Sequence, residues 1–358
     1  MLTKTSMQDQ WYHKIFSTTP GGFEQRALEI FRYQATHNEV YGTYVQALGT
    51  NPLRVQTLTG IPFLPVRFFK THNVQTGNFN AQAIFESSGT NGAMNSRHKV
   101  KDLSWYETSF TRCFESFYGP VKNWCIIGLL PSYLERKNSS LVWMVDRLVQ
   151  LSGRTQSGFY LNEYEQLAAV LAELEKRKQK TLLIGVTFAL LDFAEQYPLP
   201  LQHTIIMETG GMKGRRKEMI RAEVHEALKD AFAVPVIHSE YGMTELLSQA
   251  YSKGGGLFHC PPWMKIVVRD EEDPFVIKQE GVGTINVIDL ANIHTCSFIA
   301  TDDAGKLYAD ACPPARAGTD GDDPRLNDSV GQAVGRGSFE VLGRVDGSDL
   351  RGCSLMVI

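Results

Sequence analysis

Several features that identify particular protein classes are missing from this chain. Its six cysteines, at positions 113, 125, 260, 296, 312 and 353, form no Cys-x-x-Cys pair, which argues against a zinc ribbon or a disulfide framework and for reduced thiols. No signal peptide is visible, and no stretch approaches the roughly 20 apolar residues of a membrane-spanning helix. The net charge of −3 provides no basic field for nucleic acid. We therefore expect a cytoplasmic globular protein with no membrane span and no nucleic-acid partner.

In the middle of the chain, short apolar runs alternate with amphipathic segments. The alternation predicts buried strands at Trp124–Leu130, Leu182–Val186, Thr204–Met207 and Val234–Ile237, separated by helices at 140–151, 163–178, 188–197 and 213–231. Strands that alternate with helices form βαβ units, in which a mainly parallel sheet is covered on both faces. The expected fold class is therefore α/β.

The two ends of the chain have a different character. Residues 22–49 carry apolar side chains at helical spacing, whereas Gly281–Asp289 and Cys296–Ala300 look like strands with no helix between them. Residues 309–338 are rich in Gly, Asp, Pro and Ala and predict a mobile surface loop. We expect a core of residues 1–338 followed by a stub at 339–358; the core comprises a helical segment 1–60, a βα part 61–260 and a β-rich part 261–338 that includes the loop.

A run of small polar residues follows the predicted strand Ala83–Phe85; it consists of Ser87, Ser88, Gly89, Thr90, Asn91 and Gly92. Such a run can cradle polyphosphate, because small residues let backbone amides approach phosphate oxygens and hydroxyls add donors. An ordinary polar turn has the same composition. It is not a Walker A loop, because the Gly-x-x-x-x-Gly-Lys-Ser/Thr pattern is absent. The basic residues that follow are Arg97, His98 and Lys99; we take Lys99 as the phosphate contact and leave the other two open.

Polar residues also follow two predicted strands at their carboxyl ends, where open α/β sheets place their ligands. After Val234–His238 comes Glu240-Tyr241-Gly242-Met243-Thr244-Glu245. Tyr241 can stack on a purine, Thr244 can donate to a phosphate or a carboxylate, and Glu245 is a hard oxygen ligand suited to Mg²⁺. Alternatively, Thr244 caps a helix at a solvated strand-to-helix junction. After Thr204–Met207, Gly210 and Gly211 would let the backbone approach adenine.

Two further motifs lie near the C-terminus, Ala300-Thr301-Asp302-Asp303 after a predicted strand and Gly343-Arg344-Val345-Asp346. In this order along one chain, the four motifs resemble those of adenylate-forming enzymes, which activate a carboxylic acid as an acyl-AMP. The chain is most similar to the acyl-protein synthetases of the bacterial luminescence fatty-acid reductase system. They share Tyr-Gly-Met-Thr-Glu and a Gly-Arg-x-Asp…Asp-x-Arg-Gly-Cys ending, which here runs from Gly343 to Cys353.

The resemblance implies an adenylate-forming α/β core with mainly parallel sheets and a β-rich subdomain. The sequence departs from the family in one respect: only twelve residues follow Asp346, so we expect the small C-terminal domain with its catalytic lysine to be absent. It implies ATP and Mg²⁺ as cofactors, with Thr244, Glu245 and Cys353 as catalytic residues and Glu245 as the Mg²⁺ ligand. The nucleotide-binding residues that it implies are Ser87, Ser88, Gly89, Thr90, Gly92, Lys99, Gly210, Gly211, Tyr241, Gly242, Asp302 and Arg344. Asp302 would be a buried acid on the ribose hydroxyls, with Asp303 as its solvated neighbour.

The implied reaction converts a carboxylic acid, by resemblance a fatty acid, and ATP into acyl-AMP and pyrophosphate, and then transfers the acyl group to a thiol. The Cys353 thiolate is the candidate acceptor, since Arg351 beside it favours ionisation; packing in a terminal strand is the alternative role for Cys353. A protein partner would be an acyl reductase or an acyl transferase. Two alternatives stay open: a ligase of the phenylacetate–CoA ligase type with coenzyme A as acceptor, and a catalytically silent nucleotide-binding protein.

Overall fold

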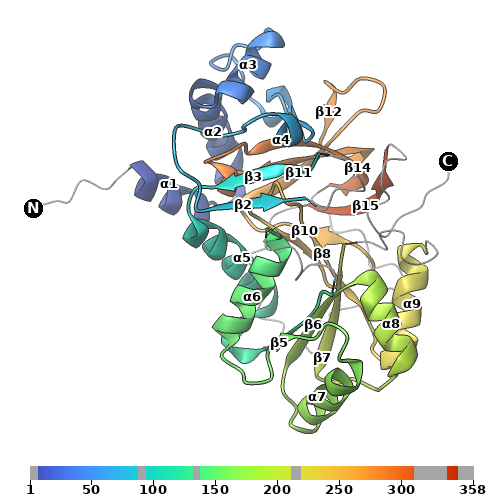
Figure 1. Ribbon diagram of the computed structural model, residues 1–358. Helices are drawn as coiled ribbons and strands as arrows, with labels where there is room; N and C mark the ends of the chain where they lie inside the picture. The colour runs from blue at the N-terminus through green and yellow to red at the C-terminus, as the bar shows by residue number, and fades with distance from the viewer. Residues whose placement is uncertain (1–6, 88–93, 132–137, 211–218, 310–336, 346–358) are drawn as a thin grey trace, which may run out of the picture.

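The computed structural model describes five stretches of the chain, residues 7–87, 94–131, 138–210, 219–309 and 337–345, which are coloured in Figure 1. Several predicted features lie outside these stretches. They are the phosphate-loop residues Ser88, Gly89, Thr90 and Gly92, the residues Gly211 and Cys353, and positions 310–336 of the predicted loop.

The described helices are α1 (Met7–Phe16), α2 (Phe23–His37), α3 (Glu39–Ala47), α4 (Phe68–Thr71), α5 (Leu103–Tyr118), α6 (Ser140–Ser152), α7 (Tyr164–Lys176), α8 (Thr187–Gln196) and α9 (Arg221–Phe232). Three of them begin where a side chain accepts a first-turn backbone N–H: Asn38 before α3, Asp102 before α5 and Ser139 before α6. Within the described residues, no helix combines the length and the apolar character that crossing a membrane requires.

The described strands are β1 (Leu64–Pro65), β2 (Ala83–Glu86), β3 (Arg97–Val100), β4 (Cys125–Leu129), β5 (Gly158–Phe159), β6 (Thr181–Val186), β7 (Thr204–Thr209), β8 (His238–Tyr241), β9 (Ala250–Ser252), β10 (Phe258–His259), β11 (Met264–Arg269), β12 (Ile277–Lys278), β13 (Gly281–Asp289), β14 (Phe298–Tyr308) and β15 (Ser338–Arg344). Strands β2 and β3 form a separate hairpin. All the others join one sheet in the order β12-β11-β13-β14-β15-β10-β9-β8-β7-β6-β4-β5, with β1 beside β14.

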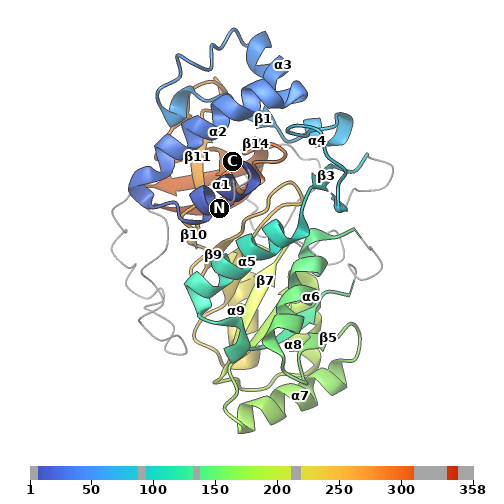
Figure 2. The same cartoon turned by 90° about the vertical axis from the view of Figure 1, so that its left-hand side faces the viewer.

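One half of this sheet is parallel. Strands β8, β7, β6, β4 and β5 run in the same direction, and every residue of β4, β6 and β7 is buried. Helices α5 and α6 cover one face and α8 and α9 the other, as the two views in Figures 1 and 2 show. The expected α/β class, with helices on both faces of a parallel sheet, is confirmed.

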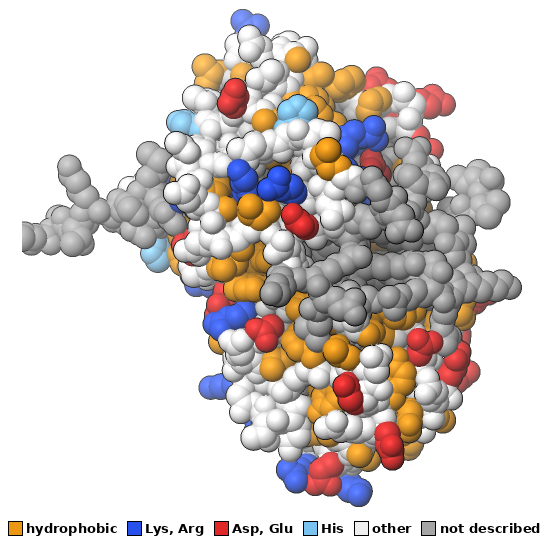
Figure 3. All heavy atoms as spheres, in the orientation of Figure 1, with side chains coloured by type: hydrophobic (Ala, Val, Ile, Leu, Met, Phe, Trp, Pro, Cys, Tyr) orange, Lys and Arg blue, Asp and Glu red, His pale blue; other side chains and the backbone are white. Residues whose placement is uncertain are grey.

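The other half of the sheet is antiparallel, from β9 to β12, and helices α1 to α3 lie beside it at the top of Figure 1. The helical character of residues 22–49 and the β-rich character of the last third therefore appear as predicted. On the face that Figure 3 shows, acidic and basic side chains of the described residues are interspersed, and neither sign forms a continuous patch.

Three element boundaries differ from the sequence predictions. The strand expected at Val234–Ile237 is wrong: β8 begins only at His238, because Pro235 has no N–H to offer a ladder. Strand β14 continues to Tyr308, so Asp302 lies inside a strand and not at its end. Residues 338–344 form β15, which pairs with β14 and β10, so the boundary placed at 338/339 falls within a strand of the core.

Two helices also differ. The helix expected at 213–231 begins at Arg221, since Met219 and Ile220 precede it without helical structure. Helix α5 was not predicted at all, although its buried aromatic side chains Trp105, Tyr106, Phe110, Phe114 and Phe117 have a helical spacing.

Candidate active site

The β2–β3 hairpin carries the predicted phosphate loop and closes it at its base. The Ser87 backbone N–H donates to the Ser96 carbonyl at 3.1 Å, and the Ser87 hydroxyl accepts the Ser96 N–H at 2.9 Å. These two hydrogen bonds hold Ser87 and Ser96, which lie on either side of the loop, next to each other. Lys99 lies in β3 opposite Ile84 and is half-buried, so the hairpin brings this cation to the same element as the loop.

The predicted segment after β7 lies next to β8. Thr209 pairs with Glu240 across the parallel strands, and its hydroxyl donates to the Glu240 carboxylate. Gly210 follows β7 with φ +69°, a conformation that favours glycine, and its carbonyl accepts the Thr187 hydroxyl at 3.0 Å. The expectation that both motifs meet at one edge of the sheet therefore holds for the described residues.

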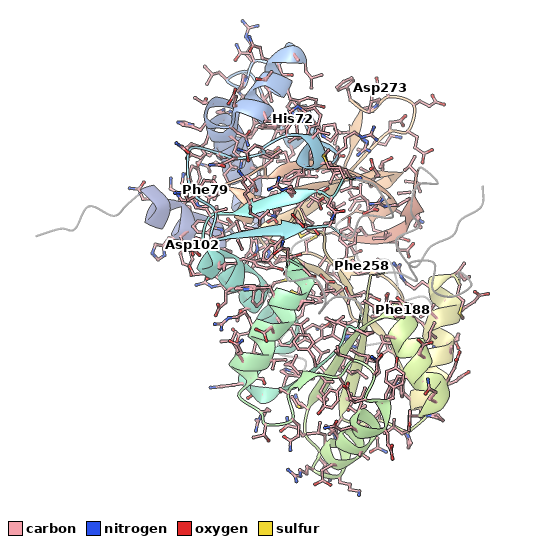
Figure 4. The ribbon with its side chains drawn as sticks, viewed as in Figure 1. His72, Phe79, Asp102, Phe188, Phe258 and Asp273 are labelled. Atoms are coloured by element: carbon pink, nitrogen blue, oxygen red, sulfur yellow. The ribbon has the colours of Figure 1, made fainter. Side chains whose placement is uncertain are left out.

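Tyr241 is linked to the β14–β15 pair. Its hydroxyl donates to the Asp303 carboxylate at 2.9 Å, and the Arg344 Nε lies 3.4 Å from the other Asp303 oxygen. Phe258 and Phe339 pack edge-on against the Tyr241 ring; Figure 4 labels Phe258 where the two halves of the molecule meet. Tyr241, which is buried, and the partly buried Asp303 and Arg344 thus form one polar cluster, the Tyr241–Asp303–Arg344 cluster.

The exposure of the two neighbouring aspartates is the reverse of what the sequence predicted. The Asp303 side chain is only 13% exposed and paired, so the expectation that it is the solvated neighbour is wrong. Asp302 is 34% exposed and lies 3.7 Å from the exposed Arg67. Successive side chains of a strand point to opposite faces, and β14 turns Asp303, not Asp302, toward Tyr241.

Thr244 and Glu245 lie in an irregular segment between β8 and β9, where side chains satisfy the backbone. The Thr244 carbonyl accepts His98 Nδ1 at 2.8 Å, and the Glu245 carbonyl accepts Asn292 Nδ2 at 2.7 Å. Just beyond, the buried Asp289 carboxylate accepts the N–H groups of residues 247 and 248 at 2.8 and 3.0 Å. The alternative of a helix capped by Thr244 is therefore wrong, because a turn and strand β9 follow.

The Glu245 side chain suits a metal ion. It is 2% exposed, and its Oε2 has no hydrogen-bond partner among the described residues. A buried carboxylate oxygen without a donor is costly, and a hard cation would satisfy it. Groups of three or more metal-ligating side chains are absent from the described residues, which is compatible with Mg²⁺ because that ion is usually held by one or two carboxylates together with substrate phosphates.

Glu240 is a site residue that the sequence did not single out. Burial raises its pKa to about 7, and the neighbouring Glu208 adds to the rise while the Thr209 hydroxyl opposes it. A Cβ on Gly242 would meet the Glu240 Oε1 at 2.5 Å, so the glycine after Tyr241 makes room for this carboxyl. A motif of two acids flanking Tyr-Gly-Met-Thr was visible in the sequence, but only Glu245 was taken as functional.

Direct bonds therefore link the elements that carry the described residues of the predicted site. His98 joins the hairpin to Thr244, the Thr209–Glu240 pair joins the ends of β7 and β8, and Tyr241 joins β8 to Asp303 and Arg344. Asp302 is left at the periphery. The residues that sequence reasoning missed are Asp303, Glu240, Asp289 and the structural role of His98. For the last two the sequence gave no signal of the contacts that hold residues 244–248, since those partners lie 41 to 197 positions away.

Comparison with known proteins places this geometry in context. The family model "Acyl-protein synthetase, LuxE" matches residues 22–358. Among solved structures, the chain is similar to a 2-hydroxyisobutyryl-CoA ligase in complex with 2-HIB-AMP and CoA, with a TM-score of 0.65, 12% identity, and coverage of 92% of this chain and 68% of that one. An open conformation of that ligase has a TM-score of 0.59 and 11% identity, with coverage of 90% of this chain and 74% of that one. An ATP-bound RpMatB-BxBclM chimera has a TM-score of 0.51 and 15% identity, with coverage of 75% of this chain and 49% of that one. None of the curated proteins matches.

At such low identities the solved structures establish the fold, which is that of adenylate-forming enzymes. The family match covers nearly the whole chain and includes all four motifs. This chain belongs to the acyl-protein synthetase family, LuxE, and is an enzyme of the adenylate-forming type.

Proposed function

We propose that the protein activates a carboxylic acid with ATP to give acyl-AMP and pyrophosphate, and then transfers the acyl group to a thiol. The observation that carries this proposal is the buried Glu245 Oε2, which has no hydrogen-bond partner in the part of the chain that the structure describes. It lies in a segment bonded to the phosphate-loop hairpin through His98 and joined in sequence to Tyr241. The family match and the fold support the same reading.

The chemistry explains why these residues are needed. Attack of a carboxylate on the α-phosphorus brings two anions together, so the site must neutralise charge. Mg²⁺ held by Glu245 and the phosphates would supply that neutralisation. The Thr244 hydroxyl would donate to the α-phosphate or to the acid, and Lys99 would add positive charge from the hairpin.

The nucleoside would lie at the strand ends. Gly210 lets the backbone approach the adenine, and Tyr241 with Gly242 would pack against it. In place of Asp302, we assign the ribose hydroxyls to Asp303, because the Tyr241 hydroxyl and Arg344 hold its carboxylate in a fixed position within the site.

For the second step we propose the Cys353 thiolate as nucleophile. It would attack the acyl carbonyl of the mixed anhydride, forming a thioester and releasing AMP. The acid is a fatty acid in this proposal, and the thioester would pass to an acyl reductase or an acyl transferase. Coenzyme A is the competing acceptor, since the 2-hydroxyisobutyryl-CoA ligase was solved with CoA.

ATP–pyrophosphate exchange tests the first step. With a panel of fatty and other carboxylic acids, exchange should require Mg²⁺ and should fall by roughly two orders of magnitude in Glu245→Gln. Glu226→Gln is the control, because Glu226 is exposed on α9. No exchange with any acid, or undiminished exchange in Glu245→Gln, would refute the assignment.

Labelling with radioactive acid tests the second step. Hydroxylamine-sensitive label should appear on the wild type and vanish in Cys353→Ser while exchange continues. Rapid acyl-CoA formation without protein label would establish coenzyme A as the acceptor and remove Cys353 from the mechanism.

A further inference from the structure

His98 is a buried histidine in the hairpin that carries the phosphate loop. It lies in β3 between Arg97 and Lys99, and its side chain is 1% exposed. Phe69 packs against the imidazole at 90°, with ring centroids 5.9 Å apart. The sequence left His98 as an alternative phosphate ligand, but both ring nitrogens are occupied within the protein.

The hydrogen bonds fix its tautomer. Nδ1 lies 2.8 Å from the Thr244 carbonyl oxygen, which can only accept, so Nδ1 carries the proton. Nε2 is then the acceptor, and it lies 3.0 Å from the Thr295 hydroxyl. Burial lowers the pKa of His98 to about 4, so the ring is neutral at physiological pH and matches this arrangement.

The partners of His98 also hold the next peptide. The Thr295 backbone N–H closes a turn by donating to the Asn292 carbonyl at 3.0 Å, and Asn292 Nδ2 donates to the Glu245 carbonyl at 2.7 Å. Asn292 and Thr295 are both fully buried. Three buried residues, His98, Asn292 and Thr295, which we call the His98 unit, therefore hold two consecutive carbonyls, those of Thr244 and Glu245. These hydrogen bonds restrict the peptide planes on either side of Glu245.

We propose that His98 is a positioning residue for acid activation: its Nδ1–H holds the Thr244 carbonyl, and thereby aims the Thr244 hydroxyl and the Glu245 carboxylate at the phosphates bound by the same hairpin. The proposal rests on the function proposed above. It also couples the hairpin to the 244–245 peptide, because a shift of β3 would move the Thr244 carbonyl through the His98 hydrogen bond.

The need for such a device follows from the local structure. Residues 243–248 belong to neither helix nor strand, so no ladder fixes the direction of the Glu245 side chain. A misplacement of about 1 Å in a reacting group can cost roughly 100-fold in rate. A neutral imidazole held by two hydrogen bonds keeps this segment rigid. It adds no charge that would compete with a bound cation for Glu245.

The test compares variants that separate the hydrogen bond from packing. His98→Asn keeps an amide N–H near the position of Nδ1, whereas His98→Leu fills the space without a donor. Thr295→Val removes the partner of Nε2 and leaves the Nδ1 bond in place. His259→Leu, a half-buried histidine in β10, is the matched control. For each folded variant, kcat and KM for ATP in pyrophosphate exchange are measured over a range of Mg²⁺ concentrations.

The proposal predicts an order of activities. His98→Leu should lose about 100-fold in kcat with KM for ATP nearly unchanged, and should need more Mg²⁺ for half-maximal rate. His98→Asn and Thr295→Val should each stay within about tenfold of the wild type, since each keeps a donor to the Thr244 carbonyl, and His259→Leu should match the wild type. If His98→Leu matches or exceeds His98→Asn, the role is packing and the proposal is wrong. Absence of exchange in the wild type would instead refute the proposed function.

Discussion

At the scale of single residues, Glu240 gives the site an expected pH dependence of stability. Its pKa is about 7 in the folded protein because of burial, and near 4.5 in an unfolded chain. Between about pH 4.5 and 7 the Glu240 carboxyl is protonated in the native state and ionised in the unfolded state. Its contribution to the free energy of unfolding therefore falls as pH rises through this range. Above pH 7 both states are ionised, and the loss is complete.

Glu240→Gln should remove this dependence. Relative to the wild type, the variant should gain stability as pH rises from 5 to 8, by an amount of order 3 kcal/mol. Urea unfolding at both pH values measures the difference, and subtraction of the two proteins isolates Glu240 from oppositely shifted groups such as Glu208. Unfolding free energies that stay parallel between pH 5 and 8 would contradict the assignment.

The two aspartates of β14 make a matched pair for a binding experiment. Asp303→Asn should weaken ATP binding by about 10- to 150-fold, because a charge-assisted hydrogen bond to a ribose hydroxyl would be lost along with the Arg344 pair. Asp302→Asn, the neighbour that faces Arg67, should change affinity less than threefold. Isothermal titration decides the matter, and a larger loss in Asp302→Asn would restore the original assignment.

At the scale of elements, helix α2 stabilises the turn at 292–295, next to the candidate active site, through the side chain of Gln34. Gln34 Nε2 donates to the carbonyls of Asn292 and Ile293 at 2.9 and 3.1 Å, and its Oε1 accepts the Ser297 N–H at 2.9 Å. Gln34 is completely buried. It therefore satisfies the backbone of the same turn that contributes Asn292 and Thr295 to the His98 unit.

Gln34→Ala should destabilise the protein by roughly 2–4 kcal/mol, because it leaves buried backbone groups unpaired. Exposed Gln46 on α3 offers the control: Gln46→Ala should lie within about 0.5 kcal/mol of the wild type. Chemical denaturation followed by circular dichroism compares the three proteins. Equal midpoints for both variants would show that the turn does not depend on α2.

Elements were predictable where the signal was local. The all-buried strands β4, β6 and β7 and the amphipathic α7 gave clear periodic patterns. Strand β8 was displaced because apolar residues around Pro235 imitate a strand that a residue without an N–H disfavours. The burial of Asp303 was missed because a one-residue shift in strand register exchanges the two faces, and no local pattern sets that register.

At the scale of the whole molecule, the two halves meet around Arg221. Its Nη1 donates to the Val341 carbonyl at 3.3 Å, its guanidinium lies 5.3 Å from the Phe258 ring centre, and its Nε is 3.7 Å from Glu208. Gly256 leaves space for it, since a Cβ there would lie 2.9 Å from Nη1. One side chain of α9 thus contacts β7, β10 and β15.

Arg221→Ala should cost about 1–3 kcal/mol, because the buried Glu208 carboxylate then keeps only His225 as a basic neighbour among the ion pairs described. Hydrogen exchange should speed up in β10 and β15 more than in β4 and β6. The exposed pair of Arg177 with Glu173 provides the comparison, and Arg177→Ala should have almost no effect. Uniform exchange throughout the sheet would show that Arg221 does not link the halves.

The site as a whole was predicted only in part. The four motifs supplied Tyr241, Thr244, Glu245 and Arg344, since each lies in a contiguous pattern. The residues that hold them in place, such as His98 and Asp289, have partners that folding alone brings near. A single sequence records which side chains are suited to chemistry, but not which distant backbone groups they must satisfy.

Gln34 and Asn38 donate to carbonyls that lie far along the sequence, which determines when these hydrogen bonds can form during synthesis. Their acceptors in the turn at 292–295 lie 257 and 258 positions later. A ribosome releases the N-terminus first, so both side chains wait until most of the chain has emerged before they find those acceptors. The contacts between the N-terminal helices and the turn at 292–295 therefore cannot form early in synthesis. Contacts between residues so far apart in the sequence favour slow folding. Nascent chains that stop before residue 292 would leave the Gln34 and Asn38 side-chain amides without these carbonyl acceptors.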